Sequence, residues 1–208
     1  MLINLFLFNI FIFVSSFSII GYGLFVNKII FNNEITNIGE IGITGFFYIF
    51  FLSIILHFFT ELNLLINSVV LILGIFSFFV FYKKFAYQIN EFRTYLIFLA
   101  LLFLVSSITL RTYADYEWYH LPYVNYLNNF KIIFGLVNLS NNYTYGHGWL
   151  DILGLFYLPI IETKGLTHLP VVFYFFFIVF FLIEYLKSNK LAIKFFSLSV
   201  IFFVLIIF

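Results

Sequence analysis

The sequence predicts an all-α protein, a polytopic transmembrane helical bundle of about six spans with additional external juxtamembrane helices. Hydrophobic residues make up 64% of the chain and charged residues only 9%, whereas a soluble domain carries roughly 25% charged residues. Apolar runs recur along the whole chain, and ~20 apolar residues suffice to cross the hydrocarbon layer as a helix. The lipid bilayer is therefore the first expected partner.

The charge pattern argues against nucleic-acid binding, and the absence of cysteine excludes any site that needs a thiol. The net charge is +1 and the basic residues form scattered pairs rather than a patch, so we expect no nucleic-acid partner. The chain has no cysteine, which excludes a disulfide framework, a thiolate metal site and a cysteine nucleophile.

Residues 1–110 are predicted to form four N-terminal transmembrane helices. The first apolar run lacks the basic n-region and small-residue cleavage site of a secretory signal, so we expect it to be retained as a span. The four predicted spans are Leu2–Val26, Ile41–Phe59, Leu64–Tyr82 and Tyr95–Leu110.

Residues 169–208 are predicted to hold two further transmembrane helices, Leu169–Leu186 and Leu191–Phe208. The second stops inside an apolar segment without the polar flank that a finished span usually has. We therefore expect this span to be truncated and the chain to be the N-terminal part of a longer protein.

Lysine and arginine clusters between the spans predict the orientation, because short cytoplasmic loops retain such residues. One cluster lies between the third and fourth spans, and the other between the last two. If both are cytoplasmic, residues 111–168 lie outside, and the run Trp149–Ile161 is a re-entrant or juxtamembrane helix. The alternative, a short tilted span, would place one cluster outside. The clusters are Lys83, Lys84 and Arg93, and Lys187, Lys190 and Lys194.

The densest group of ionisable residues in the chain runs from Arg111 to Pro122. Asp115 and Glu117 are two residues apart, so an extended backbone points both carboxylates the same way. Such a pair could coordinate a divalent metal ion through hard oxygen ligands, or act as a general base. The alternative is a solvated loop whose acids balance Arg111 and whose aromatic residues belong to the interfacial belt.

An amphipathic helix and a glycine-rich loop are predicted to follow. From Pro122 onward, apolar residues recur at helical spacing and asparagines fall opposite them, as in a helix that lies in the membrane interface. The loop 138–148 places His147 between two glycines, which suits substrate binding but also a simply solvated histidine. The apolar face is Tyr123, Leu127, Phe130 and Phe134, and the polar face is Asn125, Asn128 and Asn129.

This order of features resembles the first external loop of the GT-C superfamily of integral-membrane glycosyltransferases. The resemblance is carried by the segment Asp115-x-Glu117-x-Tyr119-His120-Leu121-Pro122, which follows an outward-emerging span and precedes an interfacial helix. Gly148-Trp149-Leu150 then opens a short apolar helix, and Thr167-His168-Leu169-Pro170 leads into a long span, as in that superfamily.

The resemblance implies an enzyme of the bacterial inner (plasma) membrane that uses a polyprenyl-phosphate-linked sugar. Its product would be an envelope glycan, lipid or protein that carries the transferred sugar on the outer face. Asp115 and Glu117 would be catalytic and would also bind any divalent metal ion. The expected substrate-binding residues are Arg111, Tyr119, His120 and His147.

Two other functions stay open at this point. A transporter or flippase would place ionisable residues in mid-membrane, whereas the predicted spans have few. A non-catalytic membrane subunit of an envelope polysaccharide system would need no acidic segment.

Overall fold

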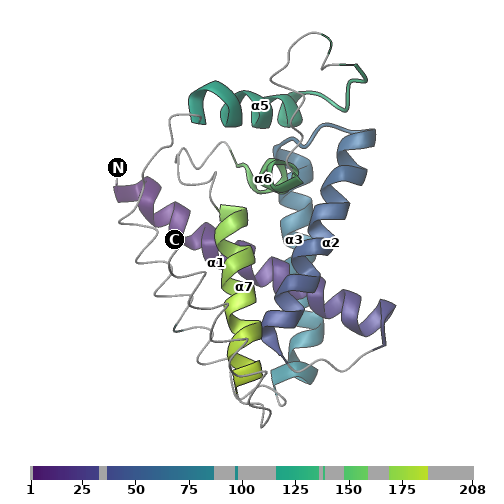
Figure 1. The fold of residues 1–208 in the computed structure, drawn as a ribbon, viewed down its shortest axis with the longest axis vertical. Coiled ribbons are helices and arrows are strands. Elements are labelled where there is room, and N and C mark those ends of the chain that lie inside the picture. Colours follow the sequence, from purple (N-terminus) through teal and green to yellow (C-terminus); the bar gives the residue numbers. More distant parts are fainter. Residues whose placement is uncertain are drawn as a thin grey trace.

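A computed structural model describes residues 2–32, 37–86, 97, 116–135, 138, 148–158 and 169–186, and every regular element in them is helical (Figure 1). This confirms the predicted all-α class. The elements in chain order are α1 (Leu2–Phe25), η1 (Val26–Ile30), α2 (Ile38–Phe59), α3 (Leu64–Ala86), η2 (Tyr116–His120), α5 (Leu121–Asn129), α6 (Gly148–Phe156) and α7 (Leu169–Leu186), where η denotes a π-helical turn.

Three of these helices are long and apolar enough to cross a membrane, and they match the first three predicted spans. The qualifying segments are Phe6–Ile30, Ile38–Phe59 and Leu64–Tyr82. Only 28% of the segment in α3 is buried, and many of its large apolar side chains, among them Leu65, Ile72 and Phe76, are exposed, as they are toward lipid. The chain is therefore a multi-pass membrane protein. The fourth and last predicted spans lie outside the described residues.

The turn between α2 and α3 forms where Glu61 and Asn63 interrupt the apolar pattern. The Asn63 Oδ1 atom accepts hydrogen bonds from the backbone N–H groups of Leu65 and Ile66, both at 3.1 Å, and so caps the start of α3. Its Nδ2 atom donates to the Glu61 carboxylate at 2.8 Å. These bonds fix the turn that joins α2 to α3, which lies between the second and third predicted spans.

Glycines allow the long helices to pack closely. Gly21 of α1 lies against the backbone at Gly74 of α3, and Gly45 of α2 lies against the backbone of α1. Gly42 of α2 makes room for the ring of Phe177 in α7. A β-carbon at any of these glycines would overlap the neighbouring helix. Small residues at helix contacts are typical of membrane bundles, where close backbone approach stabilises association.

The helix α6 is shorter than predicted. It ends at Phe156, whereas the sequence pattern extends to Ile161. Leu158 precedes Pro159, and a residue before proline disfavours the helical backbone, which explains the early end. Nine residues give about 14 Å of helix against ~30 Å of hydrocarbon, so α6 is too short to cross.

Helices α5 and α6 form a layer at one end of the bundle, here called the end layer together with η2. In Figure 1, α5 lies across the end at which α2 stops and α3 and α7 begin, and α6 lies directly beneath α5. The C-terminal ends of α3 and α7 lie together at the opposite end of the molecule. Lys83 and Lys84 belong to the last turn of α3, so their backbone lies at the end opposite the end layer. The lysines that follow α7 lie outside the described residues, and the orientation across the membrane stays a prediction.

Candidate functional site

The predicted site residues belong to the segment that leads into the end layer. The backbone of Glu117 lies in the η2 turn, and Tyr119 and His120 follow it there. Asp115 immediately precedes this turn in the sequence. Asp115, Arg111 and His147 lie outside the described residues, so their assignments stay predictions.

The buried side of α5 differs from the predicted one. Val124 and Leu127 are the buried apolar residues of the helix, whereas Phe130 follows its last residue and Phe134 is 81% exposed. The helix ends before these two aromatic residues because Phe130 adopts an extended backbone. The predicted apolar face is therefore correct at Leu127 and wrong beyond the end of the helix.

Asn128 was predicted on the polar face of α5, but it contributes to the contact with the bundle. Its Oδ1 atom accepts a hydrogen bond from the Asn67 Nδ2 atom of α3 at 3.3 Å. The same Nδ2 atom donates to the carbonyl oxygens of Gly154 at 2.8 Å and Tyr157 at 3.0 Å, at the end of α6. Asn67 is fully buried and joins α3, α5 and α6 in one network.

His57 attaches the C-terminal end of α5 to α2. Its Nε2 atom lies 3.0 Å from the carbonyl oxygen of Phe130, and because a carbonyl only accepts, Nε2 carries the proton in this contact. The backbone N–H of Ile132 donates to the carbonyl of His57 at 3.1 Å, and the imidazole ring packs edge-on against Tyr126. These contacts fix the end layer on α2 and α3.

A row of aromatic rings runs along η2 and α5. The ring centroids of Tyr119 and Tyr123 are 6.3 Å apart, and those of Tyr123 and Tyr126 are 6.1 Å apart. His120 packs against Tyr119 at 5.3 Å, and Phe130 stacks on Tyr126 at 6.2 Å. Spacings of three and four residues bring these rings to one side of the helix. The predicted substrate-binding residues Tyr119 and His120 thus lie side by side at one end of this row.

Asp151, in the first turn of α6, is an acidic residue that the sequence reasoning missed. Burial raises the pKa of its carboxyl group from 3.8 to about 6. The pKa of the Tyr123 phenol is also raised, first by burial and then by the nearby Asp151 carboxylate. Tyr123 therefore stays protonated at neutral pH and can donate a hydrogen bond. A lone acid inside the apolar run from Trp149 to Ile161 was the available signal.

No group of three or more His, Asp or Glu side chains that could hold a metal ion is found among the described residues. The predicted metal ligands are Asp115, which lies outside these residues, and Glu117, of which only the backbone is described. Their carboxylate oxygens are ligands that suit Mg²⁺ or Ca²⁺. The metal assignment stays a prediction.

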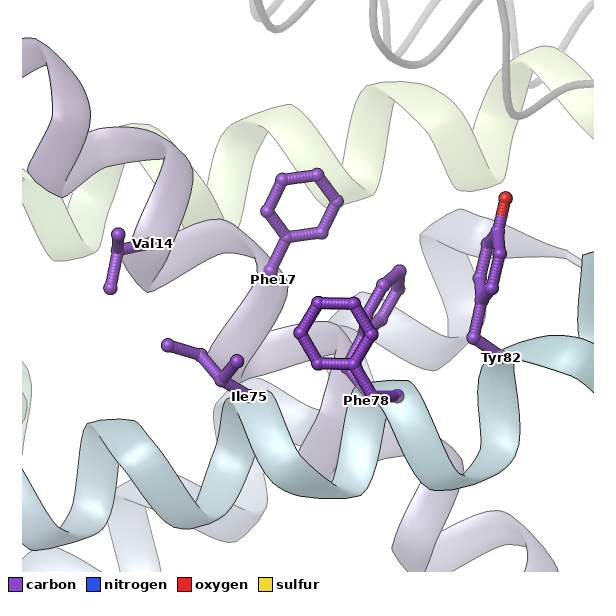
Figure 2. A pocket seen from close by; sticks show the side chains of 6 residues that line it. Val14, Phe17, Ile75, Phe78 and Tyr82 are labelled. Atoms are coloured by element: carbon purple, nitrogen blue, oxygen red, sulfur yellow. The ribbon is translucent and has the colours of Figure 1, made fainter.

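An apolar hollow lies between α1 and α3, away from the end layer (Figure 2). Its volume is about 360 Å³, and the rings of Phe17 and Phe78 in its wall pack against each other, with centroids 5.0 Å apart and planes inclined by 57°. The Tyr82 hydroxyl is the polar group among the side chains that line it. This lining offers no chemistry for catalysis, so the end layer is the better candidate site. The lining residues are Val14, Phe17, Ile75, Phe78, Phe79 and Tyr82.

Comparison with known proteins gives one match. The profile of a family described as a domain of unknown function (DUF8201) matches residues 1–208. No curated protein matches the chain. No solved structure matches it either.

Proposed function

Because the chain belongs to DUF8201, a family of unknown function, we propose from its own residues that the protein is a membrane glycosyltransferase. It transfers a sugar from a lipid-phosphate donor to an envelope glycan, lipid or protein acceptor. The reaction takes place on the outer face of the bacterial inner membrane, at the end layer.

The observation that carries the proposal is the position of the η2 turn, which includes the backbone of Glu117, directly before α5. Glu117 lies in the turn that opens α5, and α5 lies across the end of the membrane helices. Carboxylates at this level would meet the phosphate–sugar head of a lipid donor whose chain stays in the bilayer. The GT-C enzymes that the sequence resembles have an acidic residue in the corresponding loop.

Asp115 is the general base in the proposed reaction. It takes the proton of the acceptor hydroxyl as the hydroxyl oxygen forms a bond to the anomeric carbon of the sugar. The bond between that carbon and the phosphate oxygen breaks, and polyprenyl phosphate leaves with the bonding electrons. Arg111, His120 and His147 bind the phosphate charge, and Glu117 assists Asp115. A divalent ion held by the two carboxylates would add positive charge near the leaving phosphate.

One observation favours the transport alternative. Helix α1 buries polar atoms that have no hydrogen-bond partner within the described part of the chain: Asn9 Oδ1, Ser15 Oγ and Ser18 Oγ. Polar groups inside membrane helices are costly and often mark a substrate pathway. They are neutral side chains, however, and the described part of α1 offers no carboxylate or cation beside them for coupling transport to an ion.

Substitution of the two carboxylates in the full-length protein tests the proposal. Asp115→Asn is nearly isosteric and removes only charge and basicity, so we expect sugar transfer to fall by about 10²–10⁴-fold without loss of membrane insertion. Glu117→Gln should reduce transfer less if Glu117 only assists. Glu40→Gln, at the opposite end of α2, is the matched control and should keep full transfer. Full transfer by Asp115→Asn would refute the proposal.

A further inference from the structure

We propose that the junction of α5 and α6 binds a glycosyl unit, with the Asp151 carboxylate accepting a hydrogen bond from a sugar hydroxyl beside the rings of Tyr119 and Tyr123. This inference rests on the proposed function for the identity of the sugar as a substrate. The binding site itself is argued from the geometry of α5 and α6.

The first argument is the accessibility of Asp151. The residues from Leu150 to Phe156 are all buried except Asp151, which stays partly exposed. Helix α6 is packed beneath α5, where Gly154 lets the side chain of Leu127 approach closely. Of this buried stretch, Asp151 alone has a side chain that a ligand can reach.

The second argument is the surroundings of that carboxylate. The phenol of Tyr123, on the helix above, is close enough for the Asp151 charge to raise its pKa, and Tyr119 adds to the effect. A carboxylate next to aromatic rings suits a sugar, because the carboxylate accepts hydrogen bonds from hydroxyl groups and the rings pack against the apolar C–H face. A phosphate or other anion would be repelled by Asp151. The site therefore fits the sugar rather than the phosphate of a lipid-linked donor.

The third argument is energetic. Burial raises the pKa of Asp151, so ionising its carboxyl group costs more in the folded protein than in water. Hydrogen bonds from sugar hydroxyls to the ionised carboxylate would offset part of this cost. The helices packed against α6 carry these titratable groups: Tyr123 and Tyr126 on α5; Glu40, Tyr48 and His57 on α2; Tyr82, Lys83 and Lys84 on α3; and Tyr174, Glu184 and Tyr185 on α7.

Binding of simple glycosides to the full-length protein in lipid nanodiscs tests the inference. The probes are the methyl glycosides of glucose, mannose and galactose. Cyclohexanol, which has a ring of equal size and a single hydroxyl, serves as the control ligand. Binding is measured by ligand-detected saturation-transfer NMR. We expect at least one glycoside to bind, and Asp151→Asn to weaken its binding about tenfold, while Glu40→Gln has no effect. Tyr123→Phe, which keeps the ring, should reduce binding less than Asp151→Asn.

The pH profile separates a direct contact from a structural effect. Because the ionised carboxylate is the stronger acceptor, glycoside binding should strengthen between pH 5 and pH 7 with a midpoint at about 6, and Asp151→Asn should make the profile flat. Equal binding by wild type and Asp151→Asn, or a flat wild-type profile, would overturn the inference.

The sugar-transfer assay separates failure of this inference from failure of the proposed function. Binding that depends on Asp151 in a protein without transferase activity would overturn the proposed function and support the site. Transfer activity with an unchanged KM in Asp151→Asn would overturn the sugar site at Asp151 and support the proposed function.

Discussion

Removal of the side chain of Asn67, on α3, should loosen the end layer more than removal of any asparagine side chain of the end layer itself. Its Nδ2 atom donates to the carbonyls of Gly154 and Tyr157 at 2.8 and 3.0 Å. Each buried carbonyl that loses its partner costs about 1–3 kcal/mol. The Asn67 Oδ1 atom is buried without a partner among the described residues, so its removal is favourable and offsets about 1 kcal/mol of that cost. We therefore expect Asn67→Ala to destabilise the attachment of α6 by about 3 kcal/mol, within a range of about 1–5 kcal/mol.

Hydrogen exchange of the full-length protein in nanodiscs measures this effect. A loss of about 2 kcal/mol or more corresponds to roughly 30-fold weaker protection of the α6 amides. Asn67→Leu, which fills the space but cannot donate, should weaken protection as much as Asn67→Ala. The matched control is Asn129→Ala, because Asn129 is exposed and, among the described residues, its side chain bonds within α5 to the carbonyl of Asn125, at 2.7 Å.

Two results would refute this reasoning. If Asn67→Leu restored full protection, the cavity rather than the lost hydrogen bonds would explain the effect of Asn67→Ala. If Asn67→Ala changed protection no more than Asn129→Ala, the network would not hold α6 in place.

Three further predictions concern packing, pH and topology. Gly45→Ala should lower the thermal stability although alanine gains about 1 kcal/mol in helix propensity, because its β-carbon would overlap the backbone of α1; a rise in stability would contradict the packing. The carboxyl of Asp151 has a pKa of about 6 in the folded protein and a reference value of 3.8, so between these pH values the folded state binds more protons than the unfolded state. The free energy of unfolding should therefore fall, by less than about 3 kcal/mol, as the pH rises from about 4 to 6, and then level off. Asp151→Asn should remove that fall in a pH series of thermal melts, and an unchanged fall would refute it. Cysteines in Tyr116→Cys and Ser188→Cys should label from opposite sides of the membrane, and labelling from one side would overturn the orientation.

The long helices could be predicted from the sequence because composition alone determines them. Runs of apolar residues about 20 long have one stable form in a bilayer, a helix with its backbone hydrogen bonds satisfied internally. The turn at Glu61 and Asn63 was equally accessible, since an asparagine before an apolar run is a typical helix cap.

The inward side of α5 could not be predicted from its own pattern. The asparagines there look polar and solvated, but Asn128 pairs with Asn67, which lies 61 positions earlier in the chain. Only the packing of α5 on the end of α3 makes this pair. Local periodicity therefore gave the existence of the helix but not its buried face.

Only part of the candidate site could be predicted from the sequence. Asp115 and Glu117 attract notice because they form a dense acidic pair, whereas Asp151 is a single acid among apolar residues and carries no spacing signal. Its raised pKa comes from burial when α5 and α6 pack at the end of the bundle. The sequence signal was only that of a lone acid in an apolar run, and the burial that shifts its pKa is visible only in the tertiary structure.

Release of polyprenyl phosphate tests the central claim most directly. The full-length protein in nanodiscs would be mixed with undecaprenyl-phosphate-linked glucose, mannose or galactose and with an envelope extract as acceptor, and the lipid products followed by mass spectrometry. The proposed function predicts that one donor is consumed with release of undecaprenyl phosphate, and that Asp115→Asn slows this release by about 10²-fold or more while Glu40→Gln does not. Equal release by wild type and Asp115→Asn would contradict it.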